Sequence, residues 1–244
     1  MDAIILAGGF AKRMWPLTKN KPKQLLDVAG KPMLSYVIDS LNKLDLDRII
    51  VSVNSFFAPQ FQDYLDSNTH YNNIELFIEK SDNENQKLGA LGALNLLFQK
   101  KKLQGPVFIA GGDNLSDFDL TKMVTIYNKS KADVIGLFDV ENIELAKLYG
   151  IAELEDNRII DFVEKPSTPP STLAATAYWL LSESGITNFF SYINEGGDRD
   201  AMGNFLAWNV KRKSVYSVSF KGNWYDIGGL DSYSEAQKWL ERRP

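Results

Sequence analysis

Short apolar runs alternate with segments of helical spacing through the first half of the chain. The apolar runs predict buried strands at residues 3–6, 49–53, 74–78, 107–110 and 134–138. Two apolar stripes between these runs predict helices, one through Leu34, Val37, Ile38, Leu41 and Leu44 and one through Leu91, Leu94, Leu97 and Phe98. Strands and helices that alternate in this way predict an α/β fold, with a mostly parallel sheet and helices on both faces.

The pattern changes near residue 150. Apolar runs at 151–154 and 159–163 flank a polar turn and predict a β-hairpin. A loop rich in Pro, Ser and Thr is expected at 165–172. Further strands are predicted at 173–181 and 215–220, and a final helix passes through Tyr233, Ala236 and Leu240.

The composition is that of a globular protein. The 244 residues are 44% hydrophobic, which is enough to bury a core. No apolar run approaches the roughly 20 residues that span a bilayer. The chain also starts with an acidic residue, Asp2, where a signal peptide requires positive charge. We therefore expect a cytoplasmic protein that has no membrane partner.

Several kinds of chemistry are excluded by residue type. The chain has no cysteine and a single histidine, His70, which excludes disulfides, thiolate nucleophiles and metal clusters built from cysteine or histidine. The net charge of −4 argues against a nucleic-acid partner, because such proteins usually present a basic surface. An anionic ligand would have to be held by a local concentration of Arg, Lys and backbone N–H groups.

A glycine-rich loop with such a concentration follows the first predicted strand. Gly8 and Gly9 lack a Cβ, so the backbone N–H groups can approach a bulky anion. Neither the G-x-x-x-x-G-K-[ST] nor the G-x-G-x-x-G pattern is present. A tight turn with solvated lysines is the structural alternative, but the number of cations favours an anion site. These cations are Lys12, Arg13, Lys19, Lys21 and Lys23.

The loop resembles the signature of the sugar-phosphate nucleotidyltransferase family, L-A-G-G-x-G-T-R-L-x-P-L-T followed by P-K. The matching positions are residues 6–9, Arg13, residues 16–18, Pro22 and Lys23. The resemblance implies that Arg13 neutralises the departing phosphates and that Lys23 holds the α-phosphate region, both as catalytic residues. It also implies a nucleotide-binding set, which consists of Leu6, Ala7, Gly8, Gly9 and Lys12.

Two positions depart from this signature. Ala11 stands where the family usually has glycine, and Lys12 stands where it has threonine. An alanine has no easy access to positive φ, so we expect an ordinary backbone conformation at Ala11.

Two acidic residues match the metal ligands of the family. Nucleotidyl transfer adds charge where charge is already dense, so it requires a divalent cation more than a protein nucleophile. The resemblance implies Mg²⁺ bound by Asp113, which follows the strand at 107–110, and by Asp226 in a W-x-D-I-G motif. The alternatives are a turn role for Asp113 and a helix-capping role for Asp226.

Further elements resemble the base and sugar sites of the family. Residues 87–94 are similar to P-L-G-T-A-G-A-L, which implies that Gln86 and Gly89 lie beside the nucleobase. Matches to Y-G-V and E-E-K-P imply that Gly150 and Glu164 bind the sugar hydroxyls, and that Lys165 binds the sugar phosphate and is catalytic. Residues 198–205 resemble an Asp-Ala-x-Gly element of short family members, which implies a role on the sugar side.

The resemblance covers nearly the whole chain and implies a Rossmann-like mixed α/β fold. We expect one domain over 1–244, with a nucleotide-binding half at 1–140 and a sugar-phosphate-binding half at 141–244, and no C-terminal β-helix. The expected reaction joins a nucleoside triphosphate and a sugar 1-phosphate and releases pyrophosphate. The preferred pair is glucose 1-phosphate with dTTP or UTP.

Three alternatives stay open. Mannose 1-phosphate with GTP and choline phosphate with a cytidylyl donor are neighbouring substrate pairs. The third alternative is a protein of another functional class, a regulatory subunit that binds nucleotide or sugar phosphate without catalysis. The sequence leaves the oligomeric state open, including a homo-oligomer.

Overall fold

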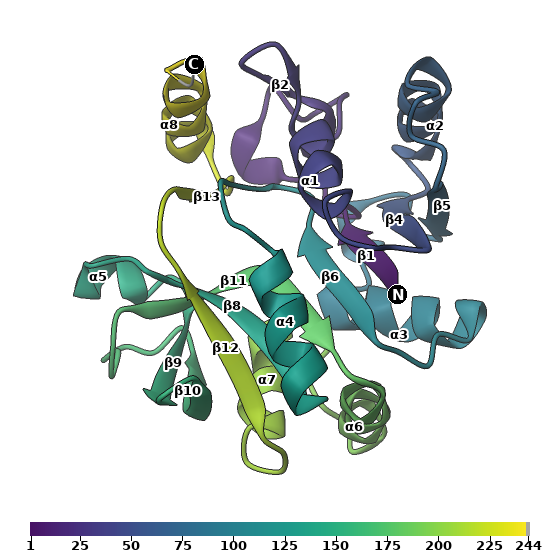
Figure 1. Cartoon of the computed structure of the whole chain (residues 1–244). Helices are drawn as coiled ribbons and strands as arrows, with labels where there is room; N and C mark the ends of the chain where they lie inside the picture. The colour runs from purple at the N-terminus through teal and green to yellow at the C-terminus, as the bar shows by residue number, and fades with distance from the viewer. Residues whose placement is uncertain (243–244) are drawn as a thin grey trace. The chain divides into compact units, whose positions relative to one another are not determined.

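The computed structural model describes residues 1–242 and divides into two compact units (Figure 1). Unit 1 comprises Met1–Leu88, Ala110–Asp117 and the chain from Asn223 onward. Unit 2 comprises Gly89–Ile109 and Phe118–Gly222. Strand β6 (Val107–Gly111) contributes residues to both units.

Unit 1 is built on parallel strands. β1 (Asp2–Leu6) pairs with β4 (Arg48–Asn54), and β4 pairs with β5 (Ile74–Glu79). Because these strands are parallel, their carboxyl ends lie at one edge of the sheet, where ligands bind in α/β proteins. The register places Leu6 beside Ser52 and Asn54 beside Glu79 at this edge.

Helices and short strands complete unit 1. The helices are α1 (Met33–Leu41), α2 (Ala58–Ser67) and α8 (Leu230–Glu241), and the 3₁₀ turns are η1 (Lys12–Met14), η2 (Lys23–Leu25) and η3 (Glu84–Gln86). Two antiparallel pairs join β2 (Asp27–Val28) to β3 (Lys31–Pro32) and β7 (Asn114–Ser116) to β13 (Trp224–Asp226).

An apolar cluster ties distant segments of unit 1 together. Met14 from η1, Met33 from α1, Leu115 from β7 and Ile227 after β13 are buried in it, with Ala236 from α8. Burying this surface offsets the conformational entropy lost when the loops become ordered. The cluster therefore holds the loop after β1 and the β7–β13 pair in fixed positions.

Unit 2 contains a mixed sheet with the strand order β11-β8-β12-β10-β9. β8 and β12 are parallel, whereas β11 and β8, β12 and β10, and β10 and β9 are antiparallel. Its strands are β8 (Asp133–Asp139), β9 (Gly150–Glu155), β10 (Arg158–Glu164), β11 (Leu173–Leu181) and β12 (Val215–Phe220).

Helices cover both faces of this sheet. Figure 1 shows α4 (Thr121–Ser130) on the near side of β8 and β12, with α7 (Met202–Asn209) on the far side. The other helices of unit 2 are α3 (Ala90–Lys101), α5 (Ile143–Ala146) and α6 (Glu183–Asn194). The predicted mixed α/β fold is confirmed, as is the β9–β10 hairpin.

One predicted helix is shorter than its apolar stripe. α1 ends at Leu41, and Asn42 is its C-cap, with the Asn42 N–H donating to the Ile38 carbonyl. Leu44 is nevertheless buried, because the chain after the helix packs back against the core. The apolar stripe thus predicted the buried positions correctly, but it overestimated the length of the helix by one turn.

Candidate nucleotide and sugar-phosphate sites

The glycine pair lies at the carboxyl edge of the unit 1 sheet. A Cβ on Gly8 would lie 2.8 Å from Glu79 Oε1, so a larger residue here would require the carboxylate to move. Asn54 Nδ2 donates to the Gly8 carbonyl at 3.0 Å and fixes the peptide. A Cβ on Gly9 would meet no atom within 4 Å, so this position faces open space. Gly9 therefore leaves room for a ligand, whereas Gly8 leaves room for a protein side chain.

The expectation for Ala11 was wrong. Ala11 adopts the left-handed conformation, with φ 48° and ψ 44°, at the N-cap of η1. This conformation costs an alanine about 1–2 kcal/mol. Two hydrogen bonds to its carbonyl hold it in place, one from Thr18 Oγ1 at 2.8 Å and one from the Met14 N–H at 3.0 Å. The loop thus keeps the backbone shape that glycine would adopt, and the buried Thr18 is part of the reason.

The neighbouring residues of the loop fall into two groups. Ala7 is buried and its N–H donates to the Ser52 carbonyl at 2.8 Å, while the Leu6 carbonyl accepts from the Gly112 N–H at 3.0 Å. Lys12 and Arg13 are exposed. Leu6 and Ala7 therefore anchor the loop to the sheet, and the two cations remain accessible to an anion.

Lys23 is buried and paired. η2 places its Nζ 2.5 Å from Asp113 Oδ2 and 2.5 Å from the Ile227 carbonyl. Lys23 is 8% exposed, so the ion pair is largely shielded from solvent. Residues from three separate chain segments therefore meet at this ammonium group.

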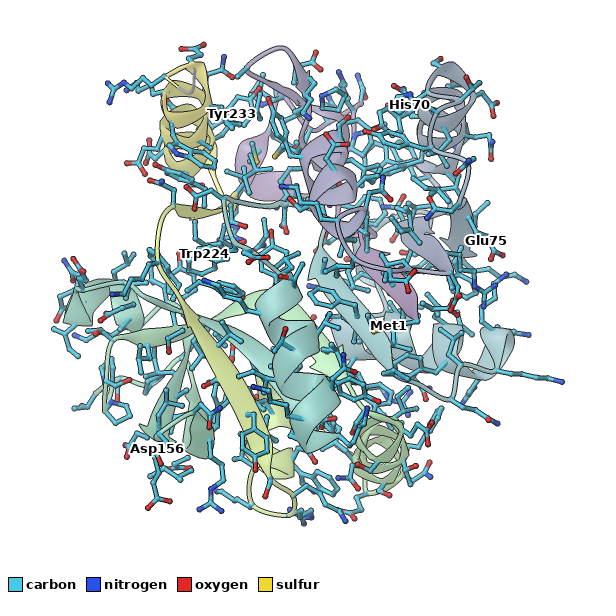
Figure 2. All side chains as sticks on the ribbon, viewed as in Figure 1. Met1, His70, Glu75, Asp156, Trp224 and Tyr233 are labelled. Atoms are coloured by element: carbon cyan, nitrogen blue, oxygen red, sulfur yellow. The ribbon has the colours of Figure 1, made fainter. Side chains whose placement is uncertain are left out.

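Asp113 and Asp226 are brought together by a residue between them. Asn114 Nδ2 donates to Asp113 Oδ1 at 3.1 Å and to Asp226 Oδ1 at 3.2 Å. The β7–β13 register aligns Asn114 with Asp226. Trp224, labelled in Figure 2, donates its ring N–H to Asn114 Oδ1 at 2.8 Å and so orients the amide. Sequence analysis missed Asn114, although it directly follows the predicted ligand Asp113.

The two carboxylates have opposite pKa shifts. Burial and the negative charge of Asp113 raise the pKa of Asp226 to about 6. Burial also works against ionisation of Asp113, but the charge and hydrogen bond of Lys23 hold the pKa of Asp113 below its ordinary value. Two acids facing each other with one buried cation leave an excess of negative charge, which is the condition that favours cation binding.

The residues of this cluster fit Mg²⁺. Magnesium prefers oxygen ligands and usually takes one or two carboxylates, with phosphates and water completing the shell. Two carboxylates come from adjacent chain segments, because Asp226 ends β13 and Asp113 directly precedes β7, the antiparallel partner of β13. Over residues 1–242, no group of three or more Asp, Glu, His or Cys residues surrounds a potential metal position.

Arg13 approaches the same cluster. A Cβ on Gly228 would lie 3.4 Å from Arg13 Nη2, so the guanidinium lies close to the turn after Asp226. Its positive charge contributes to lowering the pKa of Asp226, although burial outweighs it. Unit 1 thus brings together Arg13, Lys23, Asp113 and Asp226.

In unit 2, Glu164 lies in a cradle of two glycines. β9 and β10 align Gly150 with Glu164, and a Cβ on Gly150 would lie 2.7 Å from Glu164 Oε2. A Cβ on Gly203, at the start of α7, would overlap the same oxygen. Burial raises the pKa of Glu164, and the charge of Lys165 opposes this shift. Gly203, from the 198–205 element, therefore lies against Glu164.

Lys165 has an unusual backbone. Its φ is 45°, in the left-handed region, and its N–H donates to the Tyr149 carbonyl at 3.1 Å. A non-glycine residue in this region stores strain, which proteins tolerate mostly at turns and functional sites. The bond to Tyr149 joins the two predicted sugar elements, Y-G-V and E-E-K-P.

The predicted base contacts have other neighbours. Gly89 has a φ of 73°, and a Cβ there would strike the Arg199 carbonyl oxygen. The Ala90 N–H donates to the Asp200 carbonyl at 3.0 Å. Gln86 Oε1 accepts from the Asp82 N–H at 2.9 Å. The close approach at Gly89 is thus made by the 198–205 segment, and the base-binding roles of Gln86 and Gly89 stay predictions.

Comparison with known proteins identifies the family. The family model described as nucleotidyl transferase matches residues 2–243. The chain belongs to the nucleotidyl transferase family. This confirms the resemblance to sugar-phosphate nucleotidyltransferases seen in the sequence. Among residues 1–242, no helix of this family member is long and apolar enough to cross a membrane.

Curated relatives have several substrate names. A protein of Sulfolobus acidocaldarius, provisionally named a mannose-1-phosphate guanyltransferase, is 31% identical over 93% of this chain and 60% of its own length. The D-glycero-alpha-D-manno-heptose 1-phosphate guanylyltransferase of Aneurinibacillus thermoaerophilus is 28% identical over 99% of both chains. This chain spans about three fifths of the length of the first relative. It covers 63% of mannose-1-phosphate guanylyltransferase 1 of Arabidopsis thaliana.

Solved structures share the fold. A Bacillus anthracis protein, provisionally named a glucose-1-phosphate thymidylyltransferase, superposes with a TM-score of 0.86 at 25% identity, covering 100% of this chain and 96% of that one. A UDP-glucose pyrophosphorylase complexed with UDP-glucose superposes with a TM-score of 0.84 at 22% identity, covering 99% of both chains.

Proposed function

We propose that this nucleotidyl transferase family member makes a nucleotide sugar and pyrophosphate from a nucleoside triphosphate and a sugar 1-phosphate. The observation that carries the proposal is the cluster of Lys23, Asp113 and Asp226. A buried ammonium beside two facing carboxylates suits a reaction in which phosphates and a divalent cation meet. The glycine loop and the exposed Arg13 add accessible donors for the triphosphate.

In this reaction a phosphate oxygen of the sugar 1-phosphate attacks the α-phosphorus. A new P–O bond forms while the bond between the α-phosphorus and the oxygen that leads to the β-phosphate breaks, and pyrophosphate leaves with the bonding electrons. Arg13 would neutralise the leaving phosphates, because a guanidinium offers several donors in one plane. Lys23 would hold the α-phosphate region as a point charge. The backbone of Gly8 and Gly9 would line the nucleotide.

Asp113 and Asp226 would hold Mg²⁺. The cation supplies charge neutralisation and alignment of the phosphates when it is bound. The protein residues prepare for it: Asn114 spaces the carboxylates, and Lys23 keeps Asp113 ionised. The raised pKa of Asp226 would fall when a cation replaces the repulsion from Asp113.

The sugar 1-phosphate would bind to residues of unit 2. Glu164 would offer carboxylate oxygens to sugar hydroxyls, and the missing side chains of Gly150 and Gly203 give the carboxylate the space that it occupies. Lys165, held by Tyr149, would bind the sugar phosphate and orient its attack.

Pyrophosphate release tests this function. We expect release when the protein is incubated with Mg²⁺, a nucleoside triphosphate and a sugar 1-phosphate, and none when either substrate is omitted. The panel pairs GTP, UTP, dTTP, CTP and ATP with glucose 1-phosphate, mannose 1-phosphate and choline phosphate. Glucose 1-phosphate with dTTP or UTP is the pair predicted from the sequence, and mannose 1-phosphate with GTP is its main rival. A folded protein that binds nucleotide but never releases pyrophosphate would instead support the regulatory-subunit reading.

A further inference from the structure

β5 is the outermost strand of the sheet in unit 1, and β4 is its neighbour (Figure 1). The N–H of Ile49 in β4 donates to the Asn73 carbonyl at 2.8 Å, just before β5 begins. Successive residues of a strand direct their backbone groups to opposite edges, so the odd-numbered residues of β5 face β4. The backbone N–H and C=O groups of the even-numbered residues therefore point outward, away from β4. These residues are Ile74, Leu76 and Ile78.

The outward edge of β5 lacks features that commonly keep edge strands apart. Its six residues include no proline, glycine or lysine, and the register with β4 shows no bulge. Ile78 is 53% exposed, and Ile74 and Leu76 are partly exposed. These three side chains lie on one face of the strand, because side chains alternate between faces. An edge with outward-pointing donors and acceptors and an apolar row is a template for another strand.

The two acidic residues of β5 restrict how a second copy of the strand can pair with it. Outward-facing residues of two antiparallel strands must lie opposite each other to exchange hydrogen bonds. A two-fold register centred on Glu75 would place this residue opposite Glu75 of the partner subunit. A register centred on Phe77 would place Glu75 opposite the partner subunit's Glu79. Like charges in directly opposite positions are destabilising, so both registers are disfavoured.

A register centred on Leu76 avoids both contacts. It places Glu75 opposite the partner subunit's Phe77 and Ile74 opposite the partner subunit's Ile78. The outward groups of the three even-numbered residues then form three hydrogen-bonded pairs. The exposed Ile78 also gains an apolar neighbour. The sequence of β5 is therefore complementary to itself in this one register of the three.

We propose that two copies of this protein form a dimer through β5, with the two strands antiparallel about a two-fold axis at Leu76. A two-fold contact uses the same surface of both copies and is closed, so it gives a dimer and not a filament. None of the outward-facing residues Ile74, Leu76 and Ile78 is assigned above to nucleotide, metal or sugar phosphate. The dimer therefore goes beyond the proposed function and can be tested without measuring turnover.

The mass of the wild-type protein in solution is the first measurement. Light scattering should give twice the monomer mass at a protein concentration of about 100 μM and a lower mean mass on dilution. Amide hydrogen exchange then shows which backbone groups pair. The N–H groups of Leu76 and Ile78 should exchange slowly in the dimer and faster as it dissociates, while β4 protects the Phe77 N–H in both states. A protein that is monomeric at this concentration, or a dimer whose Leu76 N–H exchanges rapidly, would overturn the proposal.

The matched variants are Ile78→Lys and Ile160→Lys. A lysine on an edge strand opposes pairing by its charge and loses the apolar contact, so Ile78→Lys should raise the dimer dissociation constant by about tenfold or more. Ile160 is 46% exposed on β10 in unit 2, so Ile160→Lys removes a similar side chain from another strand and should leave the dimer intact. Equal weakening by both variants, or an unchanged dimer in Ile78→Lys, would contradict pairing through β5.

Leu76→Pro tests the backbone pairing. Proline has no N–H, and the Leu76 N–H points away from β4, so the strand should keep its bonds to β4 while the dimer loses its central pair and dissociates. A folded Leu76→Pro protein that dimerises like wild type would refute the proposed pairing. Circular dichroism during thermal unfolding shows whether each variant is folded. Should either β5 variant fail to fold, the mass and the exchange pattern of the wild-type protein still decide the outcome.

Discussion

A buried acid in unit 2 and a buried pair of acids in unit 1 differ in how their charge is balanced. In unit 2, Asp133 is 3% exposed and surrounded by neutral donors. Its Oδ1 accepts from the Ser182 N–H at 2.8 Å and from Ser182 Oγ at 2.7 Å, and its Oδ2 accepts from Asn209 Nδ2 at 2.8 Å. Both oxygens are bonded, so Asp133 in β8 is tied to Ser182, the N-cap residue of α6, and to Asn209 at the end of α7.

The unit 1 cluster is balanced differently. Asp113 and Asp226 share the single amide of Asn114, and one ammonium, Lys23, faces the pair. The cluster carries two potential negative charges against one buried positive charge, and the pKa of Asp226 rises to about 6 as a result of burial and of Asp113. Burial alone therefore does not distinguish a structural acid from a candidate ligand, whereas an excess of negative charge marks the Asp113–Asp226 pair as a candidate cation site.

Removing the excess charge should have the largest effect on activity. We expect Asp226→Asn to lower turnover by about 100- to 1000-fold, on the scale of losing one group that stabilises the transition state electrostatically. The melting temperature should not fall, because the substitution removes the repulsion from Asp113. Pyrophosphate release and thermal unfolding measure the two effects. Asp231→Asn, an exposed acid in the first turn of α8, is the control and should change neither.

Replacing Asp133 in unit 2 is expected to lower stability and to leave turnover nearly unchanged. Asp133→Ala leaves the donors of Ser182 and Asn209 buried without an acceptor, which should lower the free energy of unfolding by about 1–3 kcal/mol or more. Turnover per folded molecule should stay within twofold of wild type. Urea denaturation and active-site titration measure these quantities. A large loss of turnover in the folded variant would break the contrast between the two clusters.

An intermediate effect is expected for the exposed cation of unit 1. Arg13→Lys keeps the positive charge near Gly228 but loses the planar set of donors, so we expect turnover to fall about tenfold. The pKa of Asp226 depends mainly on burial and Asp113, so divalent-cation affinity should change little. Steady-state kinetics and a magnesium titration separate the two. Lys43→Arg, a surface change in unit 1 after α1, serves as the control.

The smallest predicted effect is a pH dependence of stability. Burial raises the pKa of Asp133 above 3.8, so between 3.8 and the raised value the folded protein keeps a proton that the unfolded chain releases. The contribution of Asp133 to the free energy of unfolding is therefore complete below pH 3.8 and declines as pH rises through the folded pKa. Asp133→Asn should remove this decline in chemical denaturation at pH 4–7. Asp156→Asn, in an exposed turn, should keep it.

Much of the fold was predictable from local patterns. The strands at 173–181 and 215–220 coincide with β11 and β12, because period and apolar content are local properties of the chain. The motif matches also identified Lys23, Asp113 and Asp226 as a set, and the structure brings these three residues together. Their catalytic and metal-binding roles remain predictions until the reaction is measured.

Other features required the tertiary structure. The left-handed Ala11 depends on Thr18, and the crowding at Gly89 depends on the backbone of Arg199, which is more than 100 residues away in sequence. Asn114 became part of the site only through its pairing with Asp226. Glu79 belongs to no motif, and only the tertiary structure shows that β5 places its carboxylate against Gly8.

The sequence by itself determined the residue types of this protein's chemistry, the alternation of strands and helices, and the order of the family motifs. The tertiary structure alone decided which of its acids is satisfied and which is not. The physical reason is that the state of a carboxylate depends on desolvation and on neighbouring donors and charges, and these neighbours come from chain segments that only folding brings together. Asp133 and Asp226 are the same residue type in sequence, and their surroundings make one a structural acid and the other a candidate ligand.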